Sequence, residues 1–165
     1  MSCSASNAEF RKIVAEYSGY VYSLAYRILL NSDDARDAVQ ETFVKVLRSW
    51  SRMDPARSPK NWICTIAINA ARDVYRSQRH QRAAEELHDE AGDTGVSQPA
   101  VESRITAREI LGSLDVKYRT VMVLFYIEQR SVKEISAIMH RPAPLVKVWL
   151  CRARKALLEK FGGEV

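Results

Sequence analysis

Two helical patterns separated by only three residues dominate the last part of this sequence. The first runs from Val132 to Met139 and the second from Ala143 to about Lys160, each with apolar residues at helical spacing. Residues 140–142, with the sequence His-Arg-Pro, are predicted to form the turn between them. Because the second helix is long and basic, this is the layout of a helix-turn-helix whose second helix enters the DNA major groove.

The second helix of this pair has two different sides when its residues are placed at 100° steps. One stripe is apolar and is expected to pack inward: Val146, Leu150, Ala153 and Leu157. The outward side, together with Lys147 on its shoulder, is predicted to face DNA and carries Pro144, Val148, Cys151, Arg152 and Lys155. Arg152 is expected to bond a guanine edge, whereas Lys147, Arg154 and Lys155 suit phosphates. A solvated basic face on an ordinary surface helix is the alternative.

The charge of the chain is distributed in three blocks. The 165 residues permit one medium domain or two small ones, and the net charge of +5 with a pI of about 9.2 favours an anionic partner. Residues 1–80 hold 12 Lys/Arg against 8 Asp/Glu, residues 81–105 hold 2 against 6, and residues 106–165 hold 11 against 6. The acidic block over 81–105 is predicted to be a flexible linker. Together with helical spacing on both sides of it, this block predicts an all-α protein of two small helical domains, 1–80 and 106–165.

Further helices are predicted on both sides of this linker. Helical spacing runs over residues 9–30, and a second helix is expected from Ser32, as N-cap, to about residue 50 or 52. A loop with two prolines covers 53–59, and a third long helix covers about 60–80. Beyond the linker, residues 105–114 and 117–128 are also predicted to be helical.

The helix predicted over residues 60–80 also has two sides. Its apolar face carries Ile63, Ile66, Ala67, Ala70 and Val74. Its other face carries Thr65, Ile68, Asn69, Arg72, Arg76 and Arg79, with Trp62 and Tyr75 at the edges. Arginines bind phosphate and aromatic rings stack on unpaired bases, so this face suits nucleic acid. The alternative is that the two aromatic residues fill the core and the arginines are merely solvated.

Signals for catalysis or metal binding do not stand out. Cys3, Cys64 and Cys151 are far apart and odd in number, which argues against a disulfide framework or zinc site and favours a reducing cytosol. Cys64 is predicted to lie in the core, and a redox role of Cys151 stays open. With no P-loop or nucleophile elbow, no enzyme activity, cofactor or metal is expected. No leader and no apolar run of about 18 residues is present, so we expect a cytoplasmic protein without membrane insertion.

Three segments together resemble bacterial RNA polymerase sigma factors. Residues 32–50, SDDARDAVQETFVKVLRSW, resemble the segment that binds core polymerase, with its Q-E-x-F run at 40–43. Residues 59–80, PKNWICTIAINAARDVYRSQRH, resemble the segment that reads and opens the −10 promoter element. Residues 114–157 resemble the −35-reading domain, with matches at Leu114, Arg119, Glu134, Ile135, Val146, Lys147, Leu150, Arg152, Ala153 and Arg154.

The short form of the chain is similar to the extracytoplasmic-function class of the sigma-70 family. The resemblance covers about residues 10–80 and 106–160. The chain departs from the family pattern at Asp115 (usually proline), Ser136 (alanine), His140 (glycine) and Pro144-Leu145 (Gly-Thr). The last departure removes the threonine expected to contact a phosphate.

The resemblance assigns a role to each segment. Asp37, Gln40, Glu41 and Phe43 would dock on the polymerase clamp, and the loop 53–59 would hold a flipped base. The residues expected to contact the −10 element are Trp62, Asn69, Arg72 and Arg76. The outward side of the last helix would read the −35 element, and the linker would cross a polymerase channel.

The implied partners are RNA polymerase core (its β and β′ subunits) and promoter DNA. An anti-sigma factor is a common partner in this family, although no residue of the sequence identifies one. Two alternatives stay open on the residues alone. The first is an ordinary helix-turn-helix regulator in which residues 1–80 dimerise or sense a signal, and the second is a decoy that binds polymerase without reading DNA.

Overall fold

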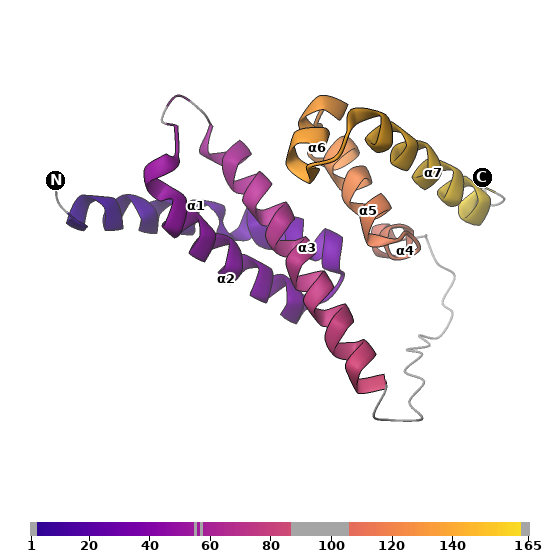
Figure 1. Ribbon diagram of the computed structural model, residues 1–165, viewed down its shortest axis with the longest axis horizontal. Helices are drawn as coiled ribbons and strands as arrows, with labels where there is room; N and C mark the ends of the chain where they lie inside the picture. The colour runs from indigo at the N-terminus through magenta and orange to yellow at the C-terminus, as the bar shows by residue number, and fades with distance from the viewer. Residues whose placement is uncertain (1–2, 55, 57, 87–105, 163–165) are drawn as a thin grey trace.

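The computed structural model describes residues 3–54, 56, 58–86 and 106–162. Over these residues the regular structure is entirely helical, as predicted. The N-terminal domain consists of α1 (Cys3–Leu29), α2 (Ser32–Ser49), a short 3-10 turn (Trp50–Arg52) and α3 (Pro59–Glu86). The C-terminal domain consists of α4 (Ala107–Gly112), α5 (Val116–Met122), a π-helical turn (Val123–Ile127), α6 (Val132–Met139) and α7 (Ala143–Phe161). Figure 1 shows α3 running along the boundary between the two groups of helices.

The N-terminal domain is a three-helix unit in which α1, α2 and α3 all contact one another. Leu30 ends α1 in the left-handed region with φ 57°. The side chain of Asn31 then accepts hydrogen bonds from the backbone N–H groups of Asp33 and Asp34, at 2.9 and 3.0 Å. Asn31 is therefore the N-cap of α2, and the prediction of Ser32 was wrong by one residue. Both residues are good caps, and the extended backbone of Asn31 decides between them.

The third helix differs from its prediction in length and in burial. α3 continues to Glu86, so residues 81–86 of the predicted linker are helical, and residues 87–105 lie outside the described residues. Ile68, which the sequence placed on the outer face, is fully buried. The reason is that α3 packs against α6 as well as against α1 and α2, so two sides of the helix are covered. Cys64 is buried, as predicted.

The helix-turn-helix has the predicted boundaries. Ser131 and Glu134 form a capping box at the start of α6, in which each side chain accepts a hydrogen bond from the backbone N–H of the other residue. His140 ends α6 in the left-handed conformation, φ 51° and ψ 48°, which explains why glycine is usual there. Pro142 is the N-cap of α7, and Val146, Leu150 and Ala153 pack inward as predicted.

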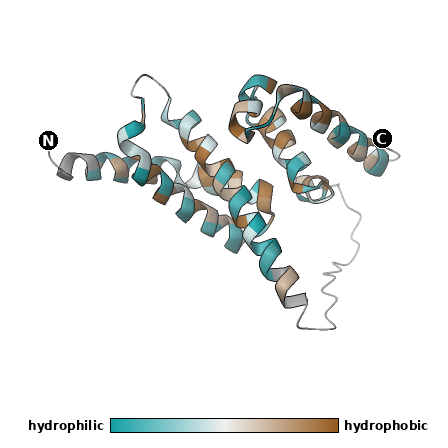
Figure 2. Ribbon diagram, viewed as in Figure 1, coloured by the Kyte–Doolittle hydropathy of each residue, from teal (hydrophilic) through white to brown (hydrophobic). Residues whose placement is uncertain are grey.

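The two domains share one hydrophobic core. Buried apolar residues of α1–α3 and of α5–α7 belong to the same cluster. Figure 2 shows hydrophobic and hydrophilic residues alternating around these helices, as expected when each helix has one buried side. At the edge of the shared core, the Tyr20 hydroxyl of α1 donates a 2.6 Å hydrogen bond to Glu128. The structure is therefore a closed arrangement, in which the C-terminal domain packs on the N-terminal domain.

Arg119 connects the two domains from a buried position. Only 9% of its surface is exposed, and its guanidinium donates to the carbonyls of Leu111 (2.8 Å) and Leu114 (3.0 Å) in its own domain. It also donates to the carbonyl of Ile28 near the end of α1. Burial lowers the pKa of Arg119, and the nearby Tyr75 and Asp115 oppose that decrease. The side chain thus satisfies three carbonyls where the domains meet.

We predict that Arg119→Met lowers the free energy of unfolding by about 1–3 kcal/mol, because three carbonyls each lose a donor. Urea unfolding followed by circular dichroism measures the effect. Lys133→Met, an exposed change in the same domain, is the control and should shift stability by less than about 0.5 kcal/mol. Equal stability of the two variants would contradict the role of Arg119.

A second prediction concerns the capping box. Ser131→Ala should cost about 1 kcal/mol of stability, because the N–H of Glu134 loses its acceptor at the start of α6. Ser131→Thr keeps the hydroxyl and should restore most of the loss. Thermal unfolding of the three proteins is the measurement, and a threonine variant as unstable as the alanine variant would refute the capping argument.

Candidate polymerase and nucleic-acid interfaces

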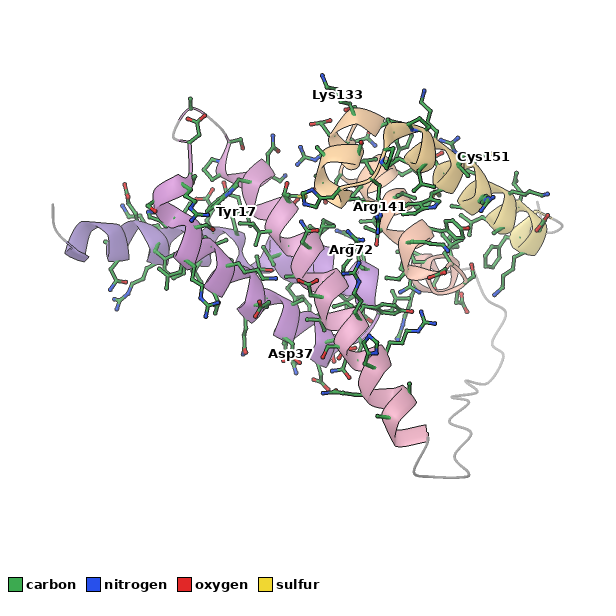
Figure 3. The ribbon with its side chains drawn as sticks, in the orientation of Figure 1. Tyr17, Asp37, Arg72, Lys133, Arg141 and Cys151 are labelled. Atoms are coloured by element: carbon green, nitrogen blue, oxygen red, sulfur yellow. The ribbon has the colours of Figure 1, made fainter. Side chains whose placement is uncertain are left out.

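The outward side of α7 is an open surface. Its six predicted residues are all exposed: Pro144, Lys147, Val148, Cys151, Arg152 and Lys155. Figure 3 labels Cys151 on this helix, on the part of the C-terminal domain that lies away from α3. Lys155 forms one exposed ion pair with Glu159 at 3.8 Å, which costs little to break in solvent. The structure thus leaves this set of side chains free to meet a partner.

Arg154 has a different environment from the one its sequence position indicated. Its Nε donates a 2.7 Å hydrogen bond to the Tyr126 hydroxyl, and its guanidinium lies 5.6 Å from the ring centres of both Phe125 and Tyr126. These contacts hold the guanidinium on the π-helical turn. Sequence reasoning missed this pair because residues 28 positions apart meet only through the packing of α7 on α5.

The predicted −10 residues on α3 fall into two groups. Asn69, Arg72 and Arg76 line one cavity together with residues 139–141, the turn between α6 and α7. Arg72 is half-buried and donates to the Met139 carbonyl at 3.4 Å. Burial lowers the pKa of Arg72 most, and the nearby positive charges of Arg76 and Arg141 lower it further. In the closed arrangement the C-terminal domain therefore covers part of this face.

Trp62 lies at the other end of α3 and does not join this group. Its ring centre is 6.4 Å from that of Trp50, beside the loop that precedes α3. With Ser58, Asn61 and Thr65 it lines an open cavity of about 560 Å³. This space lies next to the described part of the loop, and residues 55 and 57 lie outside the described residues.

The outer face of α2 combines polar and apolar side chains. Asp37 and Gln40 are exposed, and Glu41 is half-buried. Phe43, by contrast, is only 8% exposed and belongs to the core, so any contribution to docking is indirect. The family resemblance had assigned this ring to the polymerase contact, with part of it expected in the core. Its burial follows from the contacts that α2 makes with α1 and α3.

Sequence reasoning missed two exposed apolar residues on α2. Val44 is 42% exposed and Leu47 is 55% exposed. They lie four and seven positions after Gln40, which places all three on one side of the helix. That spacing was available in the sequence, but only the structure shows that the core leaves these two residues uncovered.

Lys45 connects this face to α3. Its ammonium lies 3.4 Å from the Glu41 carboxylate and 2.9 Å from that of Asp73. Burial opposes its charge, yet the two carboxylates hold the pKa of Lys45 above its usual value. Lys45 thereby joins the α2 face to α3 through an ion pair.

The described residues contain no group of three His, Cys, Asp or Glu side chains arranged to hold a metal ion. Within the same part of the chain, no helix has both the length and the hydropathy required to cross a bilayer.

Family models match both domains. Sigma-70 region 2 matches residues 13–81, and Sigma-70 region 4 matches residues 106–157. Among curated proteins, the ECF RNA polymerase sigma factor SigW of Bacillus subtilis is 32% identical over 92% of this chain and 88% of its own length.

Solved structures have the same fold over nearly the whole chain. The sigma factor RpoE, in complex with the anti-sigma factor NepR from Bartonella quintana, superposes with a TM-score of 0.69 at 20% identity, over 95% of this chain and 99% of its own. CnrH, in complex with the cytosolic domain of CnrY, superposes with a TM-score of 0.64 at 25% identity, over 96% of this chain and 91% of its own. The chain therefore belongs to the extracytoplasmic-function class of sigma factors, which direct promoter-specific initiation by RNA polymerase.

Proposed function

We propose that this sigma factor divides its work among three surfaces. The N-terminal domain, which ends with α3 at residue 86, holds core polymerase through α2 and contacts the −10 element through α3. The C-terminal domain (106–165) reads the −35 element through α7, and the segment between them is the linker. The observation that carries this proposal is the outward side of α7, where six side chains suited to a DNA groove are all exposed on one helix of a capped helix-turn-helix.

The −35 contacts are proposed from the chemistry of the exposed side chains. Val148 is 41% exposed near the start of α7 and suits the methyl group of thymine. Arg152, one turn further along, suits the O6 and N7 atoms of guanine, while Lys147 and Lys155 suit phosphates. Pro144 and Cys151 complete the surface. Arg154, held by its aromatic pair, instead stabilises the position of α7 on the π-helical turn.

The −10 contacts are proposed for the two ends of the α3 face. The cavity beside Trp62 has the size and the aromatic wall that a flipped base needs, and Asn69, Arg72 and Arg76 continue the surface along the helix. Because residues 139–141 cover part of this second group, we infer that the C-terminal domain moves away from α3 before DNA binds there.

The polymerase contact is proposed for Asp37, Gln40 and Glu41 together with Val44 and Leu47. Exposed apolar side chains rimmed by polar ones are typical of protein interfaces. No catalytic step is assigned to this chain, and it is proposed to work in the cytoplasm, where RNA polymerase is found. Because RpoE and CnrH were solved with NepR and CnrY, we also propose that an anti-sigma factor binds this chain.

The overall test is transcription in vitro. The purified chain, core polymerase and a candidate promoter should give RNA from one start site, and the chain alone should bind that promoter poorly. Binding of DNA without core would favour an ordinary regulator, and binding of core without specific RNA would favour a decoy.

Single-residue variants of α7 should separate base reading from phosphate binding. Arg152→Ala is expected to cost about 1–3 kcal/mol at one −35 base pair and to relax the preference there. Lys155→Ala should weaken binding to all promoter sequences alike. Promoter activity on every single-base variant of the −35 element is the measurement, and an unchanged base profile for Arg152→Ala would reject its assignment.

A second pair of variants tests the apolar part of the α2 face. Leu47→Glu should weaken binding to core polymerase by about tenfold or more, because a charge would be buried at the centre of the contact. Leu158→Glu is the matched control, since Leu158 is 70% exposed near the end of α7. Titration of labelled protein with core polymerase measures both, and an equal effect of the two variants would remove Leu47 from the interface.

A further inference from the structure

A cleft lies between α3 and the C-terminal domain, and five cations line it. It has a volume of about 300 Å³ and is walled by the second half of α3, the start of α5, the α6–α7 turn and α7. The basic side chains at its walls are Arg72, Arg76, Arg79, Lys117 and Arg141. They come from two domains, so only the closed arrangement brings them together. We call this space the inter-domain cleft.

Protein carboxylates neutralise little of this charge. Asp115 lines the cleft but forms an ion pair with Lys117 at 3.6 Å. Asp73 reaches Arg76 at 3.9 Å while holding Lys45 at 2.9 Å. Among the described residues, no carboxylate forms an ion pair with the other three arginines: Arg72, Arg79 and Arg141.

The positive charges act on one another across the cleft. Figure 3 labels Arg72 on α3 and Arg141 on the C-terminal domain, where the two groups of helices face each other. Beyond the effect of burial, the charges of Arg76 and Arg141 lower the pKa of Arg72, and the carboxylate of Asp73 only partly opposes them. Closing the two domains thus has an electrostatic cost, which an anion between them would relieve.

Two half-buried aromatic residues give the inter-domain cleft a second property. Tyr75 of α3 and Trp149 of α7 line it from opposite domains. An aromatic wall stacks on a nucleobase, and neighbouring arginines bind phosphate oxygens. The volume of the cleft is that of a small-molecule site, and it lies between two packed domains, so it suits a small ligand better than a duplex.

We propose that the inter-domain cleft binds a nucleoside polyphosphate, with the phosphates at the arginines and the base against Tyr75 or Trp149. Such a ligand needs both walls, so it binds the closed arrangement more tightly than an open one. By linkage it stabilises the closed arrangement and opposes exposure of the α3 face. Through this site, the concentration of nucleotide would control how much of the protein has its α3 face exposed.

Calorimetric titration of the full chain with ATP, inorganic tripolyphosphate and adenosine tests the site directly. ATP should bind most tightly, tripolyphosphate more weakly and adenosine not measurably. The double variant Arg79→Gln/Arg141→Gln, with one change on each wall, should bind ATP at least about tenfold more weakly. Lys12→Gln/Lys133→Gln removes the same charge from exposed positions outside the cleft and should change binding by less than about twofold.

Hydrogen exchange then locates the ligand. Saturating ATP should protect amides both in the second half of α3 and around the start of α5, and the Arg79→Gln/Arg141→Gln variant should lose both effects. Protection confined to one domain would overturn the inter-domain site. Equal weakening of ATP binding in the control variant would also overturn it. The proposal would likewise fail if ATP did not bind and single-stranded DNA bound instead, in a way that depends on Arg79 and Arg141.

Recognition of the base is tested by comparing ATP with tripolyphosphate. Tripolyphosphate that binds as tightly as ATP would overturn recognition of the base. None of these measurements uses polymerase or promoter, so failure of the site is distinguishable from failure of the proposed −10, −35 and core contacts.

Discussion

The closed arrangement depends on satisfying backbone carbonyls where helix ends are buried between two domains. A helix leaves its last carbonyls without intrahelical partners, and burying them without donors costs free energy. Arg119 supplies the donors for the end of α1 and for the α4–α5 turn at the same time. Guanidinium suits this position because its donors are arranged in a fixed planar fork. The shared apolar core then forms around a contact whose polar groups are satisfied.

The same local rules position the DNA-reading helix. The capping box at Ser131 begins α6, the left-handed His140 ends it, and the short turn that follows sets the direction of α7. The apolar stripe of α7 packs inward, which leaves its polar side exposed. Arg154 contributes to this positioning through its hydrogen bond to Tyr126. The reading surface is thus a consequence of how the opposite side of the helix is anchored.

The face of α3 that we propose for DNA is the one that contacts the C-terminal domain in the structure, so the two contacts exclude each other. Its arginines suit nucleic acid, yet in the closed arrangement Arg72 donates to Met139 and the α6–α7 turn covers its neighbours. Bringing those arginines close to Arg141 concentrates positive charge in the inter-domain cleft. Packing of the shared core therefore favours the closed arrangement, and repulsion among the cations opposes it. A small anion in the cleft would shift the balance toward the closed arrangement.

Local sequence by itself determined the helices, the helix-turn-helix and the outward side of α7, because periodicity, caps and turns act over a few residues. The polar residues of the outer α2 face, Asp37, Gln40 and Glu41, were also predicted as a docking surface. Val44 and Leu47 were missed because their exposure depends on which neighbouring helices cover them. Only the tertiary structure decided that Ile68 and Phe43 are buried. The same holds for the aromatic partners of Arg154 and for the contact of Arg72 with the other domain. These facts depend on contacts between residues that are distant in sequence. The helical repeat predicts on which side of a helix a residue lies, but not which other element covers that side.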